Sequence, residues 1–241
     1  MLAILQKELI GFFSAFMAYV IIGFFLLVIS LWMWVFPDTN VLDIGYADLQ
    51  PLFGFGPYVL MFLVPAITMS LLAEERKLGT LEVLLTSAIT PTQLVLGKYL
   101  ASLTMILITL LLTSSYYISI YYLASPTGNI DTAAVIGSYL GLMLLAATFA
   151  SIGLGASAIT ESQVIAFLVG VLLCFLLYQG FDAWSTLKTW KPYSLLLAQA
   201  GLLYHYEAVS RGVIDSRDLI YFFSLITLLL TANSLFLSYK R

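Results

Sequence analysis

The chain has 241 residues, of which 61% are hydrophobic and only 10% are charged. Soluble domains carry about 25% charged residues, so this composition excludes an ordinary soluble protein and predicts a membrane protein. The net charge of −3, without a basic tract, gives no reason to expect a nucleic-acid partner.

The segment 1–16 (MLAILQKELIGFFSAF) has apolar residues at helical spacing, with Lys7 outside the apolar stripe. This pattern favours a helix in the membrane interface that leads into the first span; the alternative is the end of one longer helix. Because Glu8 follows the lysine at once and no small-residue cleavage site follows, we expect no signal peptide. The stripe consists of Leu2, Leu5, Leu9, Phe12, Phe13 and Phe16.

Six stretches of the chain are long and apolar enough to cross a bilayer as helices, each of which needs about 20 residues,. The apolar centres of these stretches contain no Asp, Glu, Lys or Arg. Since intramembrane ionisable residues mark ion and proton paths, an ion-coupled transporter is disfavoured and the driving energy should come from outside the chain. The sequence predicts an all-α membrane protein with spans over residues 16–36, 57–75, 93–123, 133–158, 163–182 and 217–238.

The distribution of lysine and arginine predicts that both termini lie in the cytoplasm. Six basic residues fall on the side of the termini and four on the other, and the loops 37–56 and 124–132 contain none. All four tryptophans would then lie at the outer interface, where amphipathic rings concentrate,. The six basic residues are Lys7, Arg76, Lys77, Lys98, Lys240 and Arg241, and the tryptophans are Trp32, Trp34, Trp184 and Trp190.

The linker AEERKLGTLEVLLTSAITPTQ, residues 73–93, contains five charged residues. Gly79 suits the left-handed residue that ends a helix, Thr80 can cap the next helix, and Glu82 falls in its first turn. The TPTQ sequence at the end of the linker is a capping box that begins the third span. The linker thus predicts a short amphipathic helix over about 80–89 at the cytoplasmic surface, and the alternative is an ordinary polar loop.

The fourth predicted span carries Gly137 and Gly141 four residues apart, followed by Ala147, Ser151 and Gly155, again at intervals of four. Small residues let helices approach closely. We expect this stripe to pack against helices of the same chain rather than to form a dimer face.

The segment 183–216, between the last two predicted spans, is the least membrane-like part of the chain. Its pattern predicts one amphipathic helix from about 193 to 210, ended by Gly212, that lies in the outer interface or re-enters the membrane. The segment would either gate a path or brace the ends of the spans. The single histidine is expected to be structural rather than a ligand. The candidate residues of this segment are His205, Glu207 and Arg211.

Motifs for nucleotide and metal chemistry are absent from the sequence. It contains no G-x-x-x-x-G-K-[ST] phosphate loop, so ATP and Mg²⁺ should bind to a separate chain,. No H-E-x-x-H motif or Cys/His cluster indicates a metal, and the lone Cys174 lies in an apolar run. We therefore expect no catalytic residue and no cofactor in this chain, which would be a non-catalytic membrane subunit.

The linker motif E-E-x-x-x-G-T-x-E-x-L-L, together with six spans and a helical outer segment, resembles the permeases of the second ABC-exporter class, the ABC-2 type. In that class the short cytoplasmic helix is a coupling helix that docks in a groove of the ATPase. The resemblance therefore implies an ABC ATPase partner in two copies. One departure is Ala88, where many relatives have proline. The matching positions are Glu74, Glu75, Gly79, Thr80, Glu82, Leu84 and Leu85.

Two outer segments are similar to the gliding-motility-associated ABC exporter permease of Bacteroidota. They are residues 31–53 (LWMWVFPDTNVLDIGYADLQPLF) and 205–222 (HYEAVSRGVIDSRDLIYF). The resemblance implies a bacterial inner-membrane location, a link to type IX secretion, and a second permease-like subunit with a large extracytoplasmic domain; the other possibility is a second copy of this chain. Two alternatives remain: a permease for copper-site maturation of nitrous oxide reductase, and a non-transporting scaffold of an envelope machine.

Overall fold

The computed structural model of the chain describes residues 1–45, 47–86, 89–212 and 215–239, and every regular element among them is helical. The all-α fold with six long apolar helices is therefore confirmed. The elements are α1 (Leu2–Ser14), α2 (Phe16–Trp34), α3 (Val41–Ile44), α4 (Gln50–Lys77), α5 (Thr80–Thr86), α6 (Pro91–Leu112), α7 (Ser114–Leu123), α8 (Thr132–Ile159), α9 (Gln163–Phe175), the π-helix η1 (Leu176–Gly180), α10 (Phe181–Ser185), the 3₁₀-helix η2 (Lys188–Tyr193), α11 (Ser194–Ala200), α12 (Leu202–Ser210) and α13 (Ser216–Tyr239).

The long helices follow the predicted spans closely, with one clear difference. The second span was expected to begin at residue 57, whereas α4 begins at Gln50, whose backbone N–H donates to Asp48. Pro57 and Pro65 lie inside this helix. Proline interrupts a helix in water, but in a membrane bundle the neighbouring helices compensate the lost backbone hydrogen bond. The third span consists of α6 and α7, and the fifth consists of α9, η1 and α10.

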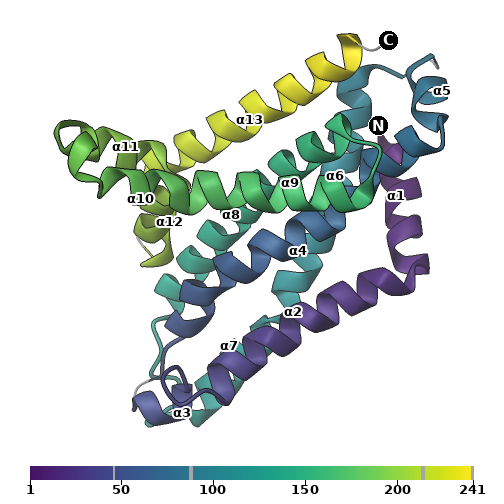
Figure 1. Cartoon of the computed structure of the whole chain (residues 1–241). Helices are drawn as coiled ribbons and strands as arrows, with labels where there is room; N and C mark the ends of the chain where they lie inside the picture. The colour runs from purple at the N-terminus through teal and green to yellow at the C-terminus, as the bar shows by residue number, and fades with distance from the viewer. Residues whose placement is uncertain (46, 87–88, 213–214, 240–241) are drawn as a thin grey trace.

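The two ends of the bundle carry different elements. Figure 1 shows that the start of α1, the end of α13 and the short helix α5 lie at one end, which we call the α5 end. Helices α3, α10, α11 and α12 lie toward the opposite end, and so do Trp32 and Trp34, in the last turn of α2. The even number of spans thus brings the start of α1 and the end of α13 to the same end of the bundle.

The centre of the bundle is formed by α4 and α8, which pack against each other. In their most apolar 18-residue stretches, 67% of α4 and 78% of α8 are buried, whereas only 28% of α2 and 17% of α13 are buried. The outer helices therefore expose apolar faces along most of their length. Such faces are stable in contact with lipid, so the chain is a multi-pass membrane protein.

The small residues of α8 contact other parts of the same chain, as predicted. A Cβ atom added to Gly137 would lie 2.9 Å from the Cα of Gly212, and one added to Gly141 would lie 2.9 Å from Cγ1 of Val209. At the other end of the stripe, a Cβ added to Gly155 would lie 2.6 Å from Oδ1 of Asn233 in α13. The stripe therefore lets α12 and α13 approach α8 closely.

Replacing Gly137 by alanine should destabilise the protein, because the new methyl group meets the backbone of Gly212, which cannot rotate away. Overpacking of this kind costs about 1–3 kcal/mol. The matched control is Gly23→Ala in α2, where a Cβ meets nothing within 4 Å. We expect thermal unfolding in detergent to occur at a lower temperature for Gly137→Ala only. Equal midpoints for both variants would show that the α8–α12 contact tolerates a methyl group.

The outer segment differs from its prediction, because two helices replace the single one expected from about 193 to 210. The backbone is extended at Gly201 (ψ 149°), which separates α11 from α12. A Cβ at Gly201 would lie 2.9 Å from Cβ of Phe181, so the chain turns where it contacts α10. Helix α12 then enters the bundle, where the hydroxyl of the buried Tyr206 donates to the carbonyl of Phe53 at 2.6 Å. This segment thus packs against the ends of α4 and α8 that lie away from the α5 end.

Helix α1 is separate from α2, as predicted, and its one buried residue, Ile4, lies outside the apolar stripe. Leu2 and Phe16 are 73% and 81% exposed, whereas Ile4 is buried against Gly97 of α6. Glu8 lies on the same face as Ile4, and its side chain is only 15% exposed. The two ends of the apolar stripe thus face outward, where lipid can cover them, whereas Phe12 in its middle packs against the core. The bundle side of α1 also carries an ionic group.

Candidate functional site

The α5 end has the local structure that the linker sequence predicts. Helix α4 ends at Lys77, and Gly79 has the left-handed backbone conformation (φ 69°) that reverses the chain without a side-chain clash,. The capping box at the start of α6 is confirmed, with the N–H of Gln93 donating to the hydroxyl of Thr90 at 3.3 Å. Thr80 differs from its predicted role, because it is the first residue of α5 rather than the cap.

Helix α5 has one face on the bundle and one face outside it. Leu81 is buried and Leu84 packs against the core, whereas Glu82 is exposed and the apolar side chain of Val83 is 68% exposed. The helix ends at Thr86, and the rest of the predicted range 80–89 includes residues 87–88, which lie outside the described residues. The side chain of Leu85 also lies outside them. An exposed apolar residue beside an exposed carboxylate is a surface that another protein can cover.

The two adjacent glutamates at the end of α4 face different surroundings. Glu74 is exposed, and its carboxylate accepts a hydrogen bond from the side chain of Gln163 at 3.1 Å. Glu75 is buried, and its backbone carbonyl accepts a hydrogen bond from the hydroxyl of Thr80 at 3.1 Å. The carboxylate of Glu75 therefore lies inside the protein rather than on its surface, while its backbone is joined directly to α5.

A four-residue charge cluster, consisting of Lys7, Glu8, Glu75 and Lys98, joins α1, α4 and α6. The ammonium of Lys98, whose side chain is 1% exposed, lies 2.7 Å from Oε1 of Glu8 and 2.9 Å from Oε2 of Glu75. It also donates to the carbonyl of Leu71 at 2.6 Å. The contact with Oε2 of Glu75 is an ion pair only, since no donor in the described part of the chain is directed at that oxygen.

Lys7 completes the charge cluster from the outside. Its ammonium donates to Oε1 of Glu75 at 2.8 Å and lies 3.6 Å from Glu8, although its side chain is 63% exposed. The hydrogen bond to Glu75 raises the pKa of Lys7 above its ordinary value. The stabilisation from this pair is therefore fully present at neutral pH, and it would be lost only as the pH rises through that raised pKa.

The charge cluster corrects one expectation from the sequence. Lys98 was counted among the basic residues that face the cytoplasm, but it is buried and paired. Glu75 and Lys98 lie buried near the α5 ends of α4 and α6, within the predicted spans but outside their apolar centres. A signal was present in the sequence: a lone lysine falls inside the predicted span 93–123, and intramembrane ionisable residues are functional candidates.

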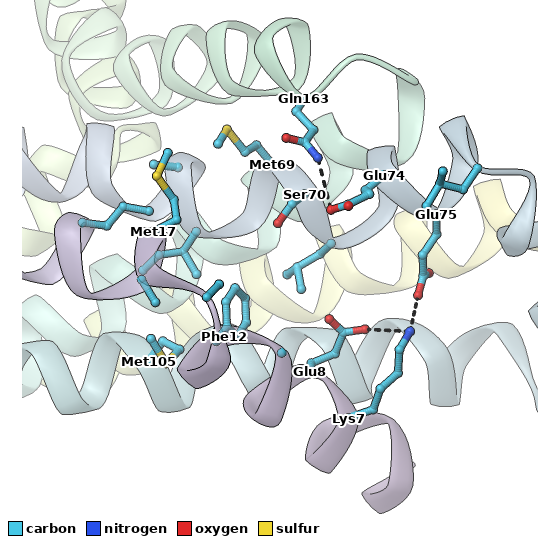
Figure 2. A pocket seen from close by; sticks show the side chains of 18 of the residues that line it. Lys7, Glu8, Phe12, Met17, Met69, Ser70, Glu74, Glu75, Met105 and Gln163 are labelled. Atoms are coloured by element: carbon cyan, nitrogen blue, oxygen red, sulfur yellow. Dashed lines mark hydrogen bonds and ion pairs between the residues drawn. The ribbon is translucent and has the colours of Figure 1, made fainter.

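A cavity of about 870 Å³ lies beside the charge cluster, between the α1–α2 elbow, α4, α5 and α6. Figure 2 shows the charged side chains of Lys7, Glu8, Glu74 and Glu75 toward one side of it, and apolar side chains toward the other. The residues of α5 that line the cavity are Thr80, Val83 and Leu84. A movement of α5 would therefore change the shape of the cavity directly. The labelled apolar residues are Phe12, Met17, Met69 and Met105.

Comparison with known families identifies the family of the chain. The model of a family described as "ABC-2 family transporter protein" matches residues 42–238, which is most of the chain. The chain belongs to the ABC-2 transporter family. No curated protein matches the sequence. The matched part of this ABC-2 chain includes α5, Glu75 and Lys98, whereas α1 with Lys7 and Glu8 precedes it. The charge cluster thus joins the ABC-2 region to the N-terminal helix.

The three candidate residues of the segment 183–216 in this ABC-2 chain fall into two groups. Glu207 and Arg211 form an exposed i,i+4 pair at 3.5 Å, which contributes little stability,. His205, by contrast, is largely buried, with Nδ1 2.6 Å from Oδ1 of Asp218 and Nε2 2.9 Å from the carbonyl oxygen of Gln199. The sequence predicted a structural role for this histidine, and its partners connect α11, α12 and α13.

The partners of His205 define its hydrogen-bonding role. A carbonyl oxygen can only accept, so Nε2 must donate to Gln199. One further proton must lie between Nδ1 and the carboxyl group of Asp218 for that contact to be a hydrogen bond. The imidazole also stacks on Tyr221, with ring centres 3.9 Å apart, and the Tyr221 hydroxyl donates to the carbonyl of Ala200 at 2.6 Å. The His205–Asp218 pair therefore fixes the α11–α12 junction onto α13.

Proposed function

We propose that this chain is the permease subunit of an ATP-driven ABC transporter and that α5 is its coupling helix. Membership of the ABC-2 family supports the permease assignment. The observation that carries the coupling role is the exposed surface of α5 at Glu82 and Val83, together with the 66% exposed Leu78 that precedes this helix. A separate ATPase, with its bound ATP and Mg²⁺, would cover this surface. The α5 end then faces the cytoplasm, and both termini lie in that compartment.

Movement of α5 would reach the spans through Glu75. The Thr80 hydroxyl holds the backbone of Glu75, and the carboxylate of Glu75 contacts Lys7 and Lys98. A push on α5 by the closing ATPase dimer would therefore displace α4 together with α1 and α6. Gly79 provides the backbone freedom for this displacement,. Such a two-state element, biased by nucleotide, is what coupling between separate sites requires.

We place the complex in the bacterial inner membrane and link it to gliding motility and type IX secretion. The support is the similarity of the two outer segments, 31–53 and 205–222, to the gliding-motility permeases. In this proposal the chain works with two ATPase copies and a second permease-like subunit that carries a large extracytoplasmic domain. The alternative partner is a second copy of the chain. The cavity beside α5 favours transport over purely mechanical work.

The variant Glu82→Lys should lose most of the ATPase stimulation, because the charge on the proposed docking surface is reversed. We expect about tenfold weaker association with the ATPase, which corresponds to ~1.4 kcal/mol. The assay isolates the tagged chain from its native membrane in mild detergent, identifies the co-purifying ATPase and measures hydrolysis.

The matched control is Glu161→Lys, which reverses a charge on the α8–α9 turn, where the side chain is 70% exposed. Glu82→Gln separates loss of the charge from its reversal. If Glu82→Lys stimulated hydrolysis as well as the unmodified chain does, α5 would not be the coupling helix. Recovery of the chain without any ATPase would remove the permease assignment itself.

A further inference from the structure

We infer that the cavity beside the charge cluster binds a phospholipid with an ammonium head group, of the phosphatidylethanolamine type, from the adjoining membrane leaflet. One of its two acyl chains would occupy the apolar part of the cavity, and the ammonium would lie at the acidic end of the cavity. Binding of this lipid does not require that the protein transports anything. Only the further idea that the cavity is the opening of a transport path rests on the proposed function.

The size and walls of the cavity fit a lipid chain. Its volume of about 870 Å³ falls within the range of ligand pockets, about 300–1,000 Å³,. Three of its apolar lining residues are methionines, whose flexible side chains adapt to ligands of irregular shape. Helices α1, α2, α4 and α6 all contribute apolar residues to the cavity wall. These residues include Phe12, Met17, Ile21, Ile67, Met69 and Met105.

The depth of the cavity indicates a ligand from the bilayer rather than from water. Along α4 the lining residues Ile67 and Glu75 are eight helical residues apart, or about 12 Å,. One leaflet of the hydrocarbon core is about 15 Å thick. The apolar part therefore extends through much of one leaflet, and it lies against α2, which is mostly unburied in the bundle.

The charge at the α5 end of the cavity favours a cation. The group contains three carboxylates, those of Glu8, Glu74 and Glu75, and two ammonium groups, those of Lys7 and Lys98. Its net charge is therefore −1. Lys7 and Lys98 are paired with Glu8 and Glu75. The carboxylate of Glu74 has the neutral amide of Gln163 as its hydrogen-bond partner and no ion pair within the described residues. An ammonium head group would neutralise Glu74, whereas a purely anionic head group would meet the surplus negative charge.

The test compares lipid retention by the purified full-length chain. The protein is incubated with equimolar phosphatidylethanolamine and phosphatidylglycerol of identical acyl chains, and bound lipid is quantified by native mass spectrometry. The wild-type chain should retain phosphatidylethanolamine in preference. Glu74→Gln should reduce that preference about fivefold, the upper range for a partly exposed ion pair. Glu161→Gln, which removes an exposed carboxylate outside the cavity, should leave the preference unchanged.

A second variant tests the apolar part without altering charge. Ala66 lines the cavity, so Ala66→Phe should lower the retention of both lipids. Unfolding midpoints of all variants confirm that each chain is folded. Equal retention of the two lipids, a preference for phosphatidylglycerol, or identical behaviour of Glu74→Gln and Glu161→Gln would each overturn the proposal. So would a lipid-free dimer in which a second copy fills the cavity. The ATPase assay above is separate, so failure of lipid binding leaves the coupling role to be judged on its own.

Discussion

Replacing Lys98 by methionine should destabilise the protein more than any other single change considered. Methionine fills a similar volume, but it leaves the carboxylates of Glu8 and Glu75 largely buried without their main cationic partner. Removing one partner of a buried ion pair costs about 3–5 kcal/mol. We expect a large fall in the thermal unfolding midpoint in detergent, together with faster proteolysis at α1, whose attachment to α6 depends on this lysine.

Two further variants separate the charge effect from packing. Lys7→Met removes the exposed member of the charge cluster and should cost at most about 1 kcal/mol. The combined variant Lys98→Met with Glu8→Gln and Glu75→Gln removes the stranded charges and should recover part of the lost stability. If Lys98→Met unfolded at the wild-type temperature, Lys98 would not hold α1 on the bundle. In that case the proposed transmission of movement from α5 through Glu75 would also lack its contact with α6.

Replacing His205 by phenylalanine should have the second largest effect. The ring still stacks on Tyr221, but both hydrogen bonds of the imidazole are lost, and Asp218 remains buried without its partner. The expected loss is about 3 kcal/mol, with local opening of the α11–α12 junction before the bundle unfolds. Hydrogen exchange of the α11 and α12 amides measures the opening directly.

A double substitution checks that the cause is the stranded carboxylate. His205→Phe with Asp218→Leu leaves no buried charge and should be more stable than His205→Phe alone. Glu207→Gln is the matched control in the same helix, because its pair with Arg211 is exposed. Unchanged exchange at α11 and α12 in His205→Phe would mean that the Asp218 and Gln199 contacts do not hold the outer segment.

The sequence by itself determined the elements whose causes are local. Each apolar stretch of sufficient length became a helix, because only internal backbone hydrogen bonding is stable in lipid. Gly79 took the left-handed conformation, and the TPTQ sequence formed its capping box, since both depend on neighbouring residues only. The close approach of α8 to its neighbours also followed from its small residues.

Only the tertiary structure decided which of the charged residues face inward. Glu8 and Lys98 are separated by 90 positions, and nothing near either residue indicates that they meet. Glu74 and Glu75 are adjacent in sequence, yet one is exposed and the other buried, because α1 and α6 bring two lysines to one side of α4 only. The break at Gly201 likewise depends on contact with Phe181. Helix formation is local, whereas a buried charge is stable only where the fold supplies its partner.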